Sequence, residues 1–98
     1  MNEANLVNST IKTIFTKPKL REVLCSLYDN DIKPTEISSL LDIDLNEVDT
    51  CLALLCKAGL VTNKIKDGVE FYSITNTKVC DAILMLKDEL YKTLRNRN

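Results

Sequence analysis

Residues Pro34 to Thr75 read PTEISSLLDIDLNEVDTCLALLCKAGLVTNKIKDGVEFYSIT, and the spacing of the apolar residues in this stretch decides the fold. A short helix is predicted to begin at Pro34, because proline fits a first helical turn, where its missing amide hydrogen costs nothing. Ile37, Leu40 and Leu41 then share one apolar face of this helix.

A second helix is predicted after the short acidic turn Asp42-Ile43-Asp44. Asp44 can accept hydrogen bonds from the free amides of the new helix, and Glu47, three residues later, completes a variant of the capping box. The stripe expected to be buried consists of Val48, Leu52 and Leu55, and the residues expected to point outward are Asn46, Glu47, Asp49 and Thr50. Ala58-Gly59 ends the helix, because glycine adopts the left-handed conformation without penalty.

A β-hairpin is predicted after this helix, because the apolar period changes to two from Leu60 onward. Asp67-Gly68 favours a two-residue type I′ turn, which places Val61 opposite Ile74 and Asn63 opposite Tyr72. That face is expected to lie on the helices, and the other face carries Lys64, Lys66, Val69 and Phe71. Two helices followed by a hairpin have the order of a winged helix-turn-helix. The predicted fold class is therefore mainly α with a small β-hairpin.

The stretch resembles the winged helix-turn-helix of the ArsR-like and MarR-like transcription regulators. The matching residues are Ile37, Leu40 and Leu41, then Val48 and Leu52, the run Lys57-Ala58-Gly59-Leu60-Val61 and the ending Phe71-Tyr72-Ser73-Ile74-Thr75. The resemblance extends from Pro18 through Thr75, whereas the flanking helices match only by position. Three segments are expected in a single winged helix domain of residues 1–98: an N-terminal helix (1–16), the winged helix-turn-helix (17–75) and a C-terminal helix (76–98).

The resemblance implies sequence-specific binding of double-stranded DNA, with a recognition helix at about 45–57 in the major groove and a wing at 61–75 on the backbone or in the minor groove. The residues expected to contact DNA are Lys33, Thr35, Asn46, Glu47, Asp49, Thr50, Lys64 and Lys66. The recognition helix departs from the family pattern because it is acidic. It carries Asp44, Glu47 and Asp49, and its one basic residue is Lys57. The alternative interpretation is therefore a winged-helix module that binds a protein partner without DNA specificity.

The two flanking helices carry more apolar surface than one small domain would cover. Their exposed stripes are expected to form a homodimer interface made of Leu6, Ile11, Phe15, Val79, Ile83, Leu86 and Leu90. The alternative is that each helix packs within its own chain. Residues 1 to 5 are expected to fray, Thr16 to cap a second helix beginning near Pro18, and Tyr28 to Lys33 to form a polar loop.

Composition limits the remaining possibilities. The chain has 98 residues, a net charge of −1, four cysteines and no histidine. Nothing predicts a membrane span or a secretory signal, so a cytoplasmic location is the default. Neither a catalytic set nor the Cys-x-Cys or carboxylate–histidine motifs of ArsR-type metal sensors is present, so no enzyme, cofactor or metal site is predicted. Cys25, Cys51, Cys56 and Cys80 are interpreted as small buried side chains, with a disulfide or a metal or redox role as alternatives.

Overall fold

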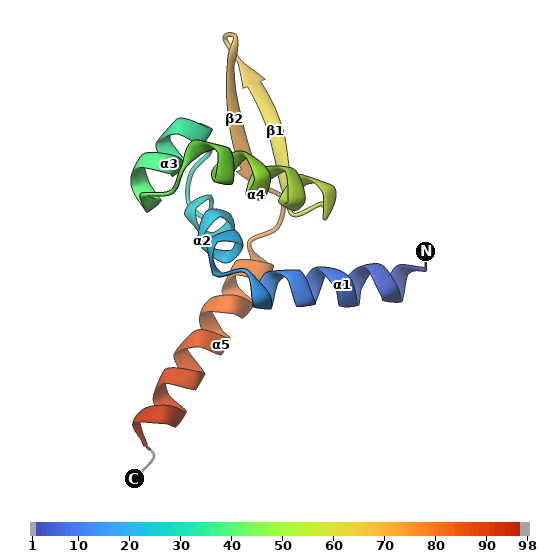
Figure 1. Ribbon diagram of the computed structural model, residues 1–98, viewed down its shortest axis with the longest axis vertical. Coiled ribbons are helices and arrows are strands. Elements are labelled where there is room, and N and C mark those ends of the chain that lie inside the picture. The colour runs from blue at the N-terminus through green and yellow to red at the C-terminus, as the bar shows by residue number, and fades with distance from the viewer. Residues whose placement is uncertain (1, 97–98) are drawn as a thin grey trace.

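The computed structural model describes residues 2–96 and is mainly helical. In chain order its elements are α1 (Glu3–Thr16), α2 (Pro18–Ser26), α3 (Pro34–Leu41), α4 (Leu45–Lys57), β1 (Val61–Lys66), β2 (Val69–Ile74) and α5 (Lys78–Arg95). Figure 1 shows the hairpin rising above α4, with α3 next to α4, α2 below these two helices, and α1 and α5 projecting away in different directions. The predicted fold class is confirmed.

The core lies where α2, α3 and α4 pack against one another. Its most deeply buried side chains are Val23, Leu24, Leu27, Ile37, Val48, Leu52 and Leu55, and Cys80 of α5 belongs to the same buried cluster. Each buried leucine or isoleucine stabilises the fold by about 1.5–3 kcal/mol relative to an exposed one. The predicted face of α3 is only partly correct, because Ile37 is buried but Leu40 is 66% exposed. An eight-residue helix has room to bury only its innermost row.

The turn between α3 and α4 is closed by two hydrogen bonds around Asp42, whose φ of 54° is left-handed. The Ile43 amide donates to the Ser38 carbonyl at 3.1 Å, and the Ser38 hydroxyl donates to the Ile43 carbonyl at 2.5 Å. Ile43 is itself buried, so the turn contributes to the core rather than being wholly polar. Asp44 caps α4 as predicted, because its carboxylate accepts a hydrogen bond from the Asn46 amide at 3.2 Å.

Gly59 ends α4 as predicted, with φ of 78°. The Gly59 amide donates to the Cys56 carbonyl and the Leu60 amide donates to the Leu55 carbonyl, both at 3.0 Å. These two bonds form the Schellman motif, which satisfies carbonyls that the end of a helix leaves free. The chain therefore leaves α4 in a fixed direction, and β1 begins at Val61, two residues after Gly59.

The hairpin has the predicted register, with Val61 opposite Ile74 and Lys64 opposite Phe71. Asp67 and Gly68 have φ of 53° and 77°, as a type I′ turn requires. The face expected to lie on the helices is covered only at its base, because Val61 is buried but Asn63 is exposed. The expected polar loop at 28–33 is wrong at Ile32, which exchanges backbone hydrogen bonds of 3.1 and 2.9 Å with Tyr72.

The terminal helices differ from the sequence prediction at their ends. α1 begins at Glu3 because the Asn2 side chain accepts from the Asn5 amide, so residues 3 to 5 are helical rather than frayed. Thr16 does not cap α2, because its hydroxyl donates to the Lys12 carbonyl within α1. The N-cap of α5 is Thr77, whose side chain makes no capping hydrogen bond, and the side chain of Asn76 just before it accepts from the Lys78 amide at 2.9 Å.

The expected C-terminal helix of 76–98 is observed as Lys78–Arg95, and residues 97 and 98 lie outside the described residues, as does Met1. Within residues 2–96, no helix combines the length and the apolar character that crossing a membrane requires.

Candidate nucleic-acid interface

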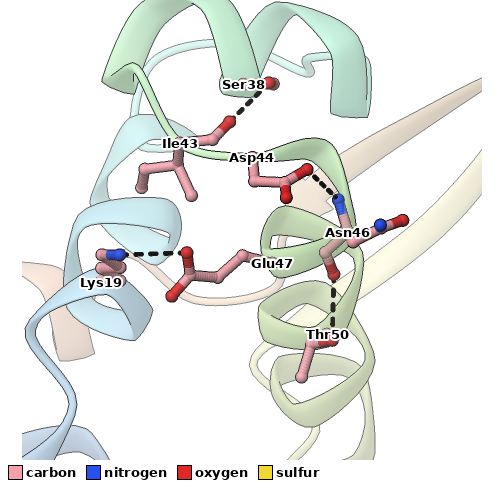
Figure 2. Close-up of polar contacts among 7 residues, drawn as sticks. All are labelled: Lys19, Ser38, Ile43, Asp44, Asn46, Glu47 and Thr50. Carbon is pink, nitrogen blue, oxygen red and sulfur yellow. Dashed lines mark hydrogen bonds and ion pairs between the residues drawn. The ribbon is translucent and has the colours of Figure 1, made fainter.

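The outward side of α4 carries the residues predicted to read bases. Asn46, Asp49 and Thr50 are exposed, whereas Val48 and Leu52 on the opposite side are buried. Figure 2 shows Asn46 and Thr50 on successive turns of this helix. The Thr50 hydroxyl donates to the Asn46 carbonyl at 3.0 Å, which leaves its methyl group and its acceptor lone pairs for a ligand. Asn46 and Asp49 are exposed, and neither side chain has a hydrogen-bond or ion-pair partner among the side chains of the described residues.

Glu47 is engaged within the protein. Its carboxylate lies 3.0 Å from the Lys19 ammonium at the start of α2, as Figure 2 shows. The hydrogen bond to Glu47 and the charge of Glu47 raise the pKa of Lys19 above its ordinary value. The capping box predicted for Asp44 and Glu47 is thus incomplete, because Glu47 turns toward α2 instead of back to its own helix. Sequence reasoning missed Lys19 as a partner, because the two residues are 28 positions apart in the chain.

The wing carries two predicted lysines in different surroundings. The Lys64 ammonium lies 3.7 Å from the Asp31 carboxylate, whose other oxygen accepts a hydrogen bond from the buried Ser73 hydroxyl. Lys66 has no ion-pair partner among residues 2–96. Sequence reasoning missed Asp31, because only the pairing of Ile32 with β2 brings it to the wing.

Lys33 joins the wing surface from the start of α3. Its ammonium lies 5.9 Å from the centre of the Phe71 ring, within the range of a cation–π interaction. Phe71 is the register partner of Lys64, so Lys33 and Lys64 share one face of the hairpin. Thr35 is exposed in the first turn of α3, two residues after Lys33 in the chain.

The structure therefore brings the predicted residues together in two groups. The first group, on α4, consists of Asn46, Glu47, Asp49 and Thr50, and the second, on the wing and the start of α3, consists of Lys33, Thr35, Lys64 and Lys66. The first group is acidic and the second is basic. A DNA duplex that contacted both groups would therefore meet the positive charge of the protein at the wing and not at α4.

A second surface consists of apolar side chains on the two projecting helices. On α1 the exposed apolar residues are Leu6, Val7, Ile11 and Phe15, and on α5 they are Leu84, Met85, Leu86, Leu90, Tyr91 and Leu94. A groove of about 300 Å³ lies between the end of α1, α2 and α5, and Phe15, Ile83, Leu86 and Leu90 line it. Of the residues predicted for a dimer interface, Val79 and Ile83 are half-buried against their own core, and the others are exposed.

Two cysteines far apart in sequence meet where α5 packs on α2. The Cys80 thiol donates to the Cys25 sulfur, and the two Sγ atoms are 2.9 Å apart. Burial and the neighbouring Cys25 raise the pKa of Cys80 to about 12 from its ordinary value of 9.0. Burial also raises the pKa of Cys51 and of Cys56. Within the described residues, no group of three or more potential ligands could hold a metal ion.

Comparison with known proteins agrees with this architecture. No protein-family model matches the chain. The transcriptional activator HlyU of Vibrio cholerae is 33% identical over 70 residues, which are 71% of this chain and 64% of that protein. The matched stretch thus spans less than two thirds of that relative.

Solved structures share the fold over nearly the whole chain. HlyU of Vibrio cholerae superposes with a TM-score of 0.70 at 26% identity, covering 93% of this chain and 98% of that one. The transcriptional repressor BigR of Xylella fastidiosa gives 0.71 at 20% identity, with 97% and 91% covered. A homodimeric winged helix-turn-helix DNA-binding domain of Mycobacterium bovis, described as a possible ArsR-family transcriptional regulator, gives 0.73 at 14% identity, with 100% and 94% covered.

These relatives are named as regulators of transcription rather than as enzymes, in agreement with the absence of a catalytic set in the sequence. The resemblance inferred from the run Lys57 to Val61 and the hairpin that follows is confirmed. The chain has the winged helix-turn-helix fold of the ArsR-like transcription regulators and is related to HlyU in both sequence and structure.

Proposed function

We propose that the protein is a cytoplasmic transcription regulator that binds specific sequences of double-stranded DNA as a homodimer. Each chain acts as one winged helix domain, with α4 in the major groove and the hairpin on the backbone or in the minor groove. The observation that carries the proposal is the exposed row Asn46, Asp49 and Thr50 on α4, together with the basic group that Lys33 and Lys64 form around Phe71 of the wing. The relationship to HlyU, a transcriptional activator, supports it.

Base reading would fall to a small number of side chains. Asn46 is exposed and can pair in bidentate fashion with adenine, while Asp49 can accept from the N4 amino group of cytosine. Glu47 is held by Lys19 and would position the helix rather than read a base. Lys33, Thr35, Lys64 and Lys66 would contact phosphates, which fix the register on the duplex without reading sequence.

Dimerisation would use the projecting helices, with residues 1–16 and 76–98 contributing. Exposed leucines at 86 and 90 and Phe15 border one groove, which is continuous with the apolar side of α5. Burying such a surface against its two-fold copy removes apolar area from water and gives the assembly two recognition helices related by the two-fold axis. The dimer would offset the weak charge of each half-site.

The acidity of α4 favours the second candidate, a module that binds a protein partner. Asp42, Asp44 and Asp49 are exposed around the recognition helix, and carboxylates repel phosphates. The deciding experiment is selection of bound duplexes from a random DNA pool at near-physiological salt. An enriched palindrome supports the regulator, whereas retention of no duplex even at low ionic strength favours the protein-binding module.

A double substitution, Lys64→Ala with Lys66→Ala, tests the wing. We expect it to weaken binding about equally for all duplexes and to reduce the salt dependence of affinity, because phosphate contacts carry no sequence information. Binding that becomes weaker for one sequence only would contradict this role of the wing.

The short distance between the Cys25 and Cys80 sulfurs favours a disulfide between them under oxidising conditions. Hydrogen peroxide would convert one thiol to a sulfenic acid and be reduced to water, and the second thiol would then displace a second water to form a Cys25–Cys80 disulfide. The sulfurs, now 2.9 Å apart, would need to approach to about 2.05 Å. Mass spectrometry after peroxide treatment should show loss of two hydrogens and a peptide joining these cysteines. A Cys51→Ser variant is the control, and an unchanged mass would exclude the disulfide.

A further inference from the structure

The carboxylate of Asp31 lies at the wing, although Asp31 belongs to the segment between α2 and α3. One of its oxygens accepts from the Ser73 hydroxyl, and the other lies 3.7 Å from the Lys64 ammonium. Ser73 is 6% exposed, so this hydroxyl has Asp31 in place of water. The carboxylate is thereby aimed at one wing lysine.

Neighbouring backbone pairing holds Asp31 in this place. The Ile32 amide donates to the Tyr72 carbonyl at 3.1 Å, and the Tyr72 amide donates to the Ile32 carbonyl at 2.9 Å. This exchange is an isolated antiparallel β-bridge between Ile32 and β2, and it brings Asp31 next to Ser73. The bridge therefore fixes the backbone next to Asp31, and the Ser73 hydroxyl holds the Asp31 carboxylate beside Lys64.

We infer that Asp31 is an internal competitor of DNA phosphate for Lys64 and so limits the affinity of the wing for any duplex. The inference rests on the proposed DNA binding. Both partners of the pair are more than half exposed, at 59% for the Lys64 side chain and 53% for Asp31, so the pair is weak and a phosphate can replace or share it. The negative charge nevertheless remains within a few ångströms of the phosphate, which is well inside the screening length of about 8–10 Å at physiological salt.

Asp31 thus acts on affinity rather than on sequence choice. Its charge faces a phosphate-binding residue and not the base-reading row of α4. Lys66, which has no ion-pair partner among residues 2–96, is the internal reference for an unrestrained wing lysine.

The test is Asp31→Asn, which removes the charge but keeps an oxygen that accepts from Ser73. Coulomb repulsion across one bridging ammonium predicts duplex binding about three- to tenfold tighter per half-site at low salt. The logarithmic salt dependence should become steeper by up to about one per half-site. Circular dichroism melting should show little change, whereas Asp31→Ala leaves the buried Ser73 hydroxyl unpaired and lowers the melting temperature.

Glu70→Gln is the matched control. Glu70 lies on the opposite face of β2 and accepts from the Asn63 amide, so the substitution changes net charge by the same amount away from Lys64. We expect less than about a twofold effect from it, because the interaction falls with distance. In addition, Asp31→Asn should give no gain in a Lys64→Ala background, since the two substitutions then act on one interaction.

Several results would overturn the inference: equal gains from Asp31→Asn and Glu70→Gln, a gain that survives in the Lys64→Ala background, or weaker binding by Asp31→Asn. A readout without DNA separates this inference from the proposed function. The acetylation rate of Lys64 relative to Lys66, measured by mass spectrometry, should rise in Asp31→Asn. An unchanged ratio refutes the pairing itself, whereas a raised ratio with no duplex bound by any variant refutes DNA binding and with it the competition.

Discussion

The Lys19 ammonium lies 3.0 Å from the Glu47 carboxylate and joins the start of α2 to the first turn of the recognition helix. Glu47 is thus engaged within the protein, whereas Asn46, its neighbour in the chain, is exposed. The two residues should therefore respond differently to substitution, although the sequence alone places both on the outward face of α4.

Asn46→Ala should relax base preference at one position of the DNA site, at a cost of about 1–3 kcal/mol in discrimination, because a bidentate contact to adenine is lost. Glu47→Gln should leave the preferred sequence unchanged. Binding of a panel of single-base variants of the selected duplex measures both. A change of preferred base by Glu47→Gln would show that this carboxylate reads DNA despite its pairing with Lys19.

Leu86→Glu with Leu90→Glu should convert the dimer to a monomer at tens of micromolar, because two charges per chain would be placed in the expected apolar interface. Sedimentation velocity measures the change. Lys92→Glu is the matched control, since it lowers the net charge of each chain by the same two units and lies on the polar side of α5, where its ammonium is 3.1 Å from the Asp88 carboxylate. A wild-type chain that sediments as a monomer would remove the basis for the dimer.

Gly59→Ala should lower the free energy of unfolding by about 1–2 kcal/mol, because φ is 78° and a side chain with a Cβ rarely adopts that conformation. No atom would obstruct the added carbon, so the cost is conformational. Urea unfolding measures it. Gly59→Asn should lose less than Gly59→Ala, because asparagine tolerates the left-handed region, and equal losses would point to another cause.

Alkaline pH should destabilise the reduced protein partly through Cys80. Its pKa in the folded state is raised to about 12 from an ordinary value of 9.0, so the unfolded chain releases the thiol proton first. The contribution of Cys80 to stability is full below pH 9 and is lost as pH rises toward 12, at up to about 1.4 kcal/mol per pH unit. Urea midpoints between pH 8 and pH 11, in the presence of reductant, should fall more steeply for the wild type than for Cys80→Ala.

Tyr28 and Tyr72 also have raised pKa values. The main cause is the hydrogen bond to Asp81 for Tyr28 and burial for Tyr72. They contribute to the alkaline loss in the same direction. Only the difference between the wild type and Cys80→Ala reports on the thiol, and identical slopes for the two proteins would contradict its role.

Local signals made the centre of the fold predictable. Proline at 34, glycine at 59 and the Asp67-Gly68 pair each act on the backbone of their own neighbourhood, and α3, the end of α4 and the hairpin register follow them. The exposure of Leu40 was not predictable in this way, because helical spacing says which residues share a face but not how far a neighbouring helix covers it.

The electrostatic details of the site depend on contacts between distant residues. Lys19 and Glu47 are 28 residues apart, and Cys25 and Cys80 are 55 apart. The position of Asp31 beside Lys64 depends on the single bridge between Ile32 and Tyr72. No period or spacing in the sequence encodes such pairings, so the chemical types of the site residues were predictable but their partners were not.

α5 is attached to the rest of the domain only at its start, so a small rotation there moves its far end by a large distance. The helix has 18 residues, about 27 Å at 1.5 Å per residue, yet it is buried only at Cys80 and half-buried at Val79 and Ile83. A rotation of about 5° around that anchor would displace the far end by about 2 Å, as a lever arm of this length requires. In an assembly built on α5, whatever shifts its first turn also changes the distance between the two copies of α4.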